Sequence, residues 1–154
     1  MPLNRQLPSL KARALACLAR REHSRLELEK KLQPHAESAE QLQQLLDALE
    51  AKNLLSAQRY ADSLIHRKAS RFGAQRILAE MKQQGLDETI RATSATVLQA
   101  TELQRATEVW QKRFGVVPQD WREKTKQAAF LQRRGFSLSV IRQVLKDAEL
   151  PGVE

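Results

Sequence analysis

This sequence of 154 residues is poor in the residues that interrupt or cross-link a chain. Glycine and proline number five each, too few for the closely spaced turns of an all-β sandwich. The single cysteine, Cys17, excludes an internal disulfide and any metal site built from several cysteines. No run approaches the ~18 consecutive apolar residues of a membrane span, and the first residues lack the apolar stretch of a signal peptide. We therefore expect a soluble, cytoplasmic protein without a membrane contact.

The chain also lacks the residue patterns that support catalysis. The histidines at 23, 35 and 66 do not have the spacing of a helical metal site. The glycines are scattered instead of forming a phosphate-binding loop, and no serine stands in a nucleophile elbow. Carboxylates stand among basic residues at helical spacing, as in Glu27 and Lys30, and surface pairing explains them. The sequence therefore predicts a protein that is not an enzyme and needs no cofactor or metal.

What the chain does contain favours helices. Gln, Glu, Lys, Arg, Ala and Leu fill most positions, and these residues lose little side-chain freedom in a helix. Hydrophobic residues make up 42% and aromatic residues 5%, so the core should be aliphatic. We predict an all-α fold of about nine short helices, at residues 9–21, 24–34, 38–52, 56–70, 73–84, 87–100, 102–114, 120–134 and 137–148.

Capping signals and apolar stripes mark these helices. Reciprocal capping boxes are predicted for the pairs Ser24 and Glu27, Ser38 and Gln41, and Asp120 and Glu123. Gly85 and Gly135 suit the left-handed position that ends a helix, and Asp87 and Ser137 can cap the helices that follow. The predicted stripes are 42/45/46/49, 103/106/110/114, 121/124/128/131 and 140/141/144/145.

A repeat with a period near 50 residues organises the chain. The five-residue segments 32–36, 81–85 and 131–135 are similar: each is predicted to end one helix just before a capped helix begins. Such a period predicts three tandem three-helix repeats in an elongated, curved array. A coincidental likeness among leucine-rich helices is the alternative. The predicted parts are an N-terminal extension 1–8, repeat one 9–55, repeat two 56–100, repeat three 101–149 and a C-terminal tail 150–154.

The third helix of repeat two is weak, because Thr93, Ser94 and Thr96 favour side-chain to backbone bonds over helix continuation. This helix either packs closely through small residues or forms a flexible joint. We favour close packing, since Val97 and Leu98 resume the apolar face.

Positive charge is the main functional signal. The net charge is +8 and the excess is spread along the chain, which suits binding of a polyanion. Solubilising charge, or cations that complement helix C-termini, would explain it without a binding site. Phe72 and Phe114, beside basic runs, are either partner-facing anchors or core residues. The candidate binding residues are Arg20, Arg21, Arg25, Arg67, Lys68, Arg71, Arg76, Lys112, Arg113, Arg133 and Arg134.

Four segments together resemble the RecX family of regulatory proteins. They are residues 21–32 (REHSRLELEKKL), 60–68 (YADSLIHRK), 72–86 (FGAQRILAEMKQQGL) and 126–136 (KQAAFLQRRGF), in the family's order. The sequence departs from the family pattern at 33–36 (QPHA), where a basic residue and glycine are common, and at 93–96. These departures leave open which surface binds.

The resemblance implies three tandem three-helix repeats and a regulator of the RecA recombinase in recombination, repair and the SOS response. Such a protein would bind in the groove of the RecA–DNA filament and depress the ATPase, recombinase and coprotease activities of RecA. We expect a monomer, because each repeat already has neighbouring repeats to pack on. Single-stranded DNA is the implied nucleic acid, with double-stranded DNA as a further candidate. The alternatives are an independent DNA-binding protein with helix-turn-helix-like units, and a structural adaptor, which would leave the charge unexplained.

Overall fold

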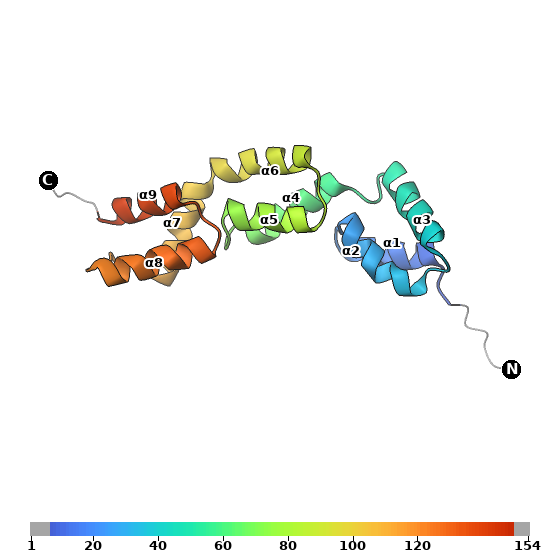
Figure 1. The fold of residues 1–154 in the computed structure, drawn as a ribbon, viewed down its shortest axis with the longest axis horizontal. Helices are drawn as coiled ribbons and strands as arrows, with labels where there is room; N and C mark the ends of the chain where they lie inside the picture. The colour runs from blue at the N-terminus through green and yellow to red at the C-terminus, as the bar shows by residue number, and fades with distance from the viewer. Residues whose placement is uncertain (1–6, 150–154) are drawn as a thin grey trace. The chain divides into compact units, whose positions relative to one another are not determined.

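The computed structural model describes residues 7–149, and within them the chain is all-α, as predicted (Figure 1). No strand occurs in this range. No predicted helix boundary differs from the observed one by more than two residues. The helices are α1 (Leu10–Arg20), α2 (Arg25–Leu32), the 3-10 helix η1 (Gln33–His35), α3 (Ala39–Ala51), α4 (Ala57–Lys68), α5 (Ala74–Gln83), α6 (Glu88–Ala100), α7 (Glu102–Arg113), α8 (Trp121–Arg133) and α9 (Leu138–Glu149).

One of the three predicted capping boxes is complete. The Ser24 hydroxyl accepts from the Glu27 amide, and the Glu27 carboxylate accepts from the Ser24 amide. The other two predictions are half wrong: Gln41 and Glu123 accept instead from the amides of Glu37 and Gln119. Their N-caps Ser38 and Asp120 have φ of −153° and −147°, against −72° at Ser24. The angle φ sets the direction of the N–H group of the N-cap residue. At Ser38 and Asp120 the side chain three residues later therefore accepts from the amide of the residue before the N-cap.

The helix ends agree with the glycine and N-cap predictions. Gly85 and Gly135 have φ of +77° and +94°, the left-handed conformation expected after α5 and α8. Asp87 accepts from the amide of Ile90 and so caps α6. The departure from the family pattern at 33–36 has a structural counterpart, since α2 continues into the 3-10 helix η1 and does not end at a glycine.

The chain divides into two compact units. Among the described residues, the first unit comprises 7–60 and 84–86, and the second comprises 61–83 and 87–149. The division into three repeats with the predicted boundaries stays a prediction. Most of the predicted N-terminal extension and the whole C-terminal tail lie outside the described residues.

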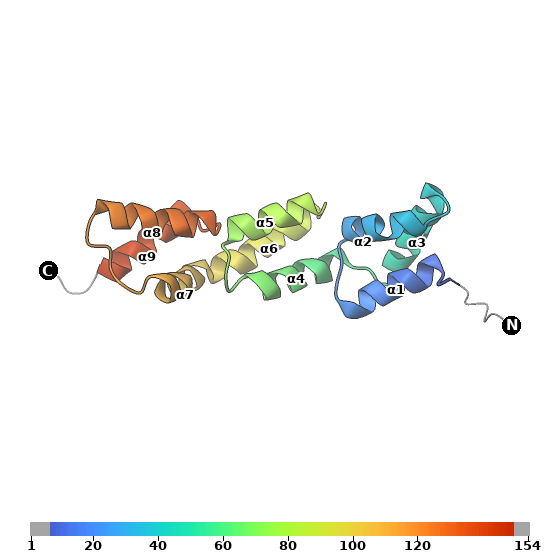
Figure 2. The same ribbon diagram turned by 90° about the horizontal axis from the view of Figure 1, so that it is seen from below.

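Leucines form the core of the first unit, where α2 packs on α1 and α3 (Figure 2). The stripe predicted on α3 is confirmed, with Leu42, Leu46 and Leu49 buried and Leu45 half-buried. The core residues are Leu10, Ala14, Leu28, Leu32, Leu42, Leu46, Leu49 and Leu55. The segment 84–86 belongs to this unit, and the Ser24 hydroxyl donates to the Gln84 side chain at 2.6 Å.

The second unit has an apolar cluster where α7, α8 and α9 pack together (Figure 1). Two predicted stripes are shifted there. Leu103 is 40% exposed because Glu102 and Arg105 take the buried face of α7. Trp121 is 72% exposed, and Gln127 is buried on α8 instead. The cluster contains Ala106, Val109, Trp110, Leu131, Phe136, Ile141, Val144 and Leu145.

Helix α6 is unbroken through the threonine-rich segment, which favours close packing over a flexible joint. The hydroxyls of Thr93 and Thr96 donate to the carbonyls four residues earlier, while Ser94 is buried. Val97 lies on the exposed side, so of the two residues predicted to resume the apolar face only Leu98 is buried. Within residues 7–149, no helix is both long and apolar enough to cross a membrane.

His23 is buried in the first unit and lies between a backbone carbonyl group and an ammonium group. Its Nδ1 is 3.0 Å from the Arg21 carbonyl oxygen, and its Nε2 is 2.9 Å from the Lys31 ammonium nitrogen. Since an ammonium only donates, Nε2 must accept and Nδ1–H must donate. Burial lowers the pKa of His23, and the charges of Arg21 and Lys31 lower it further. The hydrogen bond to the Arg21 carbonyl and the charge of Glu27 act in the opposite direction, but the net shift is downward.

We expect the first unit to lose stability on mild acidification. Because the pKa of His23 is lower in the folded protein, the unfolded chain takes up the proton first. The stabilisation is complete above about pH 6.5 and is lost as the pH falls below that value. Urea unfolding at a series of pH values would measure this. His23→Asn, which keeps a donor near the Arg21 carbonyl, should flatten the dependence, and an unchanged slope would exclude His23 as its source.

Candidate binding surface

The second unit contains a direct junction between the start of α5 and the end of α8. The amide of Gly73 donates to the Arg134 carbonyl at 2.7 Å, and the amide of Gln75 donates to the Gly135 carbonyl at 3.2 Å. The first amides of a helix and its last carbonyls have no partners within the helix. At this junction the two helix ends satisfy each other.

Two glycines allow this approach. A Cβ on Gly73 would lie 2.3 Å from the carbonyl carbon and oxygen of Gly135. A Cβ on Gly135 would lie 2.5 Å from the Cβ of Arg76, and Gly135 has the left-handed φ noted above. Any side chain at either position would therefore separate the helix ends.

Two buried charged residues of α7 complete the junction. Glu102 accepts from the amide of Ala74, a third free amide at the start of α5. Arg105 donates to the carbonyls of Ala69 and Phe72, which follow α4, and of Leu98 in the last turn of α6. Burial lowers the pKa of Arg105, and the charge of Glu102 opposes this shift. Glu102 and Arg105 therefore have structural roles, because their charged groups are engaged in hydrogen bonds with the backbone.

Arginines and phenylalanines alternate along the surface beside this junction. The guanidinium carbon of Arg76 is 4.1 Å from the centre of the Phe72 ring. That of Arg134 is 5.3 Å from Phe72 and 5.0 Å from Phe130. Arg113 continues the series, 5.5 Å from Phe130 and 5.2 Å from Phe114. We call this series the Arg–Phe row; its members are Arg76, Phe72, Arg134, Phe130, Arg113 and Phe114.

The row draws three residues from helices, two from the C-caps of α7 and α8, and Phe72 from the α4–α5 connection. Arg76 lies in the first turn of α5, Phe130 on α8 and Arg113 at the end of α7. Phe114 and Phe130 pack edge to face, with ring centres 5.4 Å apart and an interplanar angle of 87°. The half-buried rings hold the guanidinium groups in place, which lowers the entropy lost when a ligand binds.

Two shallow hollows flank Phe130 and Arg134. One, of about 420 Å³, is lined by these residues with Phe72, Arg76 and Arg133. The other, of about 440 Å³, adds residues of α7 and the α4–α5 connection, including Arg71, Lys112 and Arg113. Both hollows are open and cationic, which suits phosphate or carboxylate groups along a surface.

The charge of the row is not neutralised within the described residues. None of the ion pairs found there includes Arg71, Arg76, Lys112, Arg113, Arg133 or Arg134. The contacts of Arg76 and Arg134 beyond the rings are to carbonyl oxygens of Arg133 and Arg71. The structure thus brings six of the predicted residues together as displayed positive charge.

The remaining candidates are arranged differently. In the first unit, Arg21 pairs with Glu27 at 2.8 Å, and Arg25 pairs with Asp47 and Glu50 at 2.8 Å each. Arg20 is exposed and lines a separate hollow with Arg13 and Lys31. In the second unit, Arg67 is exposed, and Lys68 pairs with Glu80 at 2.9 Å.

Sequence reasoning missed Phe130, Glu102 and Arg105. A signal for the last two was present, since both lie on the face of α7 that carries Ala106 and Val109, where charged residues are unexpected. Phe130 could be read only as part of an apolar segment. Within residues 7–149, no group of three or more His, Cys, Asp or Glu side chains could hold a metal ion.

The comparisons with known proteins point to one family. A family profile described as "RecX, third three-helix domain" matches residues 100–145. "Regulatory protein RecX" of Ralstonia pickettii is 50% identical over 149 residues, 97% of this chain and 94% of that one. The same-named protein of Neisseria meningitidis is 41% identical over 142 residues, 91% of each chain.

Solved structures agree on the fold. The crystal structure of RecX from Lactobacillus salivarius matches with a TM-score of 0.78, covering 92% of this chain and 96% of that chain at 18% identity. A second crystal structure, of "regulatory protein RecX", matches with a TM-score of 0.74, covering 90% of this chain and 73% of the other at 22% identity.

Gly73→Ala should destabilise the second unit by about 3 kcal/mol, because the added methyl group meets backbone atoms that cannot move independently. Gly85→Ala is the control: its Cβ would meet nothing within 4 Å, so the left-handed φ alone should cost about 1–2 kcal/mol. Urea unfolding would measure both. Equal losses would show that the approach to Gly135 is not a constraint.

Proposed function

Because this chain belongs to the RecX family of regulatory proteins, we propose that it binds the RecA–DNA filament and depresses RecA activity. The affected activities are the ATPase, strand exchange and coprotease functions of RecA in recombination, repair and the SOS response. The protein acts without catalysis of its own, as a cytoplasmic monomer. Its partners are RecA and single-stranded DNA, with double-stranded DNA as a further ligand.

The Arg–Phe row carries this proposal. Its guanidinium groups are fixed by rings and carry no ion pair with a described carboxylate, so they are ready to meet anions on another molecule. A filament repeats phosphates and surface carboxylates at regular intervals. We propose that the binding residues are Arg71, Arg76, Lys112, Arg113, Arg133 and Arg134.

Among the other predicted residues, we assign Arg20 and Arg67 secondary roles, since both are exposed. Arg21, Arg25 and Lys68 already pair with carboxylates and contribute less. An exposed ion pair contributes little free energy, so exchanging its carboxylate for an anion of another molecule adds little to the binding affinity.

An independent DNA-binding protein is the competing function. A helix that reads bases presents Arg, Asn or Gln from its N-terminal end into the major groove. Arg113 and Arg133 lie instead at the last positions of α7 and α8, and Arg134 follows α8. Of the six proposed binding residues, only Arg76 lies near a helix N-terminus. The placement of the others supports contacts with phosphates or carboxylates over base reading.

The single-strand-DNA-dependent ATPase of the cognate RecA should fall when this protein is added well below one copy per RecA. A protein that bridges protomers or blocks growth acts on more RecA subunits than it contacts. Steady-state ATP hydrolysis during a titration would measure this. No change at any ratio, with the protein folded and its own DNA binding controlled for, would favour the independent DNA-binding function.

Two proposed binding residues, Arg113 of the row and Arg133 of the hollow beside it, test whether binding depends on these positions or only on net charge. Arg113→Glu with Arg133→Glu should weaken filament binding by about 1–3 kcal/mol. Both side chains are exposed, so the fold should survive. Lys11→Glu with Lys30→Glu, two exposed residues of the first unit, makes the same change in net charge.

Binding is measured by fluorescence anisotropy on RecA–DNA filaments and on bare single-stranded DNA at several salt concentrations. The Arg113/Arg133 variant should also reduce the salt dependence, because fewer counterions are released. Equal affinities for this variant and the control variant would remove Arg113 and Arg133 from the interface.

A further inference from the structure

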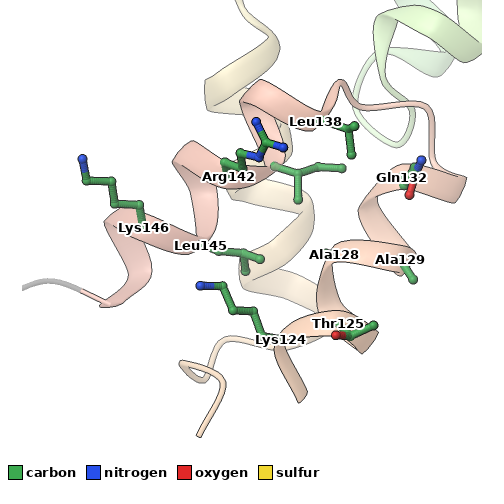
Figure 3. A pocket seen from close by; sticks show the side chains of 10 residues that line it. Lys124, Thr125, Ala128, Ala129, Gln132, Leu138, Arg142, Leu145 and Lys146 are labelled. Atoms are coloured by element: carbon green, nitrogen blue, oxygen red, sulfur yellow. The ribbon is translucent and has the colours of Figure 1, made fainter. Parts of the chain in front are cut away.

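A second concave surface lies between α8 and α9, and no residue of the Arg–Phe row lines it. It is a groove of about 640 Å³. Its apolar lining includes Ala128 and Ala129 of α8 and Leu138, Ile141 and Leu145 of α9 (Figure 3). Leu138 is 54% exposed, although it is a large apolar side chain.

The depth of the groove follows from residue size. Thr125, Ala128 and Ala129 lie one helical turn or less apart on α8, and their short side chains leave space above the helix. The longer side chains of α9 form the other wall. Figure 3 shows Leu138 near Gln132 at one end and Leu145 near Lys124 at the other, as expected for two antiparallel helices joined by a short turn.

Basic residues surround this apolar groove. Lys124 of α8 and Arg142 and Lys146 of α9 line it, and none of the residues that line it is acidic. Arg142 and Lys146 are exposed. The combination of an aliphatic floor and a cationic rim is complementary to a segment that carries apolar and acidic residues on neighbouring faces.

We propose that the groove binds an acidic amphipathic helix of a partner protein. From Lys124 to Gln132 the α8 wall rises about 12 Å, room for about two turns of a helix. Such a helix would place apolar side chains at i, i+3 or i+4 and i+7 between Ala129 and Leu138. Asp or Glu beside this stripe would meet Arg142 and Lys146. This contact goes beyond the proposed function, which places no ligand here.

The lining disfavours the other occupants. A nucleic acid strand uses aromatic side chains on which bases stack, and the groove has none. A second copy of this chain would bring a net charge of +8 toward a cationic rim. An acidic peptide is the ligand that satisfies the apolar floor and the charge together.

A phage library of random 16-residue peptides (about four helical turns) selected on the full-length protein would test this. Binders are counter-selected on Leu138→Gln, which removes exposed apolar surface with little effect on the core. We expect the sequences that remain after counter-selection, which need Leu138 for binding, to combine a stripe of apolar residues at helical spacing with Asp or Glu. If the peptides that remain specific for the wild-type protein are basic or lack this stripe, or if none are specific, the proposal is wrong.

Variants then locate the selected peptide by fluorescence anisotropy. Leu138→Gln, and separately Arg142→Glu with Lys146→Glu, should each weaken binding about tenfold. The matched controls are Val97→Gln, at a position also 54% exposed, and Lys11→Glu with Lys30→Glu. Both controls should leave the affinity unchanged.

The remaining outcomes identify the other occupants. Groove variants that bind the peptide as well as their controls do, but bind single-stranded DNA less well, would assign the groove to nucleic acid and overturn the proposal. Wild-type protein that self-associates in sedimentation, with the association abolished by Leu138→Gln, would assign it to a second copy. RecA is absent from all of these measurements, so the proposed function stands or fails separately.

Discussion

The position of the binding surface depends on the bonds that join the start of α5 to the end of α8. Amides at the start of α5 donate to carbonyls at the end of α8, and the Glu102 side chain accepts from a further amide of α5. The two helix dipoles are then head to tail, which is the favourable arrangement. Phe72 immediately precedes the junction and Arg134 is part of it, so the Arg–Phe row is positioned by backbone hydrogen bonds and not by its own long side chains.

The second unit uses arginine in two distinct ways. Arg105 is buried and forms hydrogen bonds with two carbonyls of the α4–α5 connection and one in the last turn of α6. These bonds offset the cost of removing its charge from water. Glu102, three residues earlier, does the same for an amide of α5. The arginines of the row stay near water and contact rings instead. Burial of the charge therefore distinguishes a structural arginine from one that is available to a ligand.

Much of the fold could be predicted from the sequence because its signals are local. Helix limits follow from capping residues, from glycines such as Gly135, and from apolar spacing within one helix. The errors concern which face of a helix is buried. Leu103 and Trp121 belong to apolar stripes in the sequence but are exposed. Glu102, Arg105 and Gln127 are buried instead, because they have hydrogen-bond partners elsewhere in the fold. The row itself could not be predicted, since it joins residues about 60 positions apart through contacts that no local pattern encodes.

Helix α8 connects the two surfaces. Gln127 and Leu131 fix one face of it in the core, where Gln127 accepts from the Trp110 indole and donates to the Val116 carbonyl. A second face carries Phe130 into the row, and a third carries Ala128 and Ala129 into the groove. The helix is anchored by side-chain hydrogen bonds and by its junction with α5, so the distance between the surfaces is set by one rigid element. Anions bound at the row and a peptide bound in the groove would therefore be held in fixed register, the property required of a protein that links two partners.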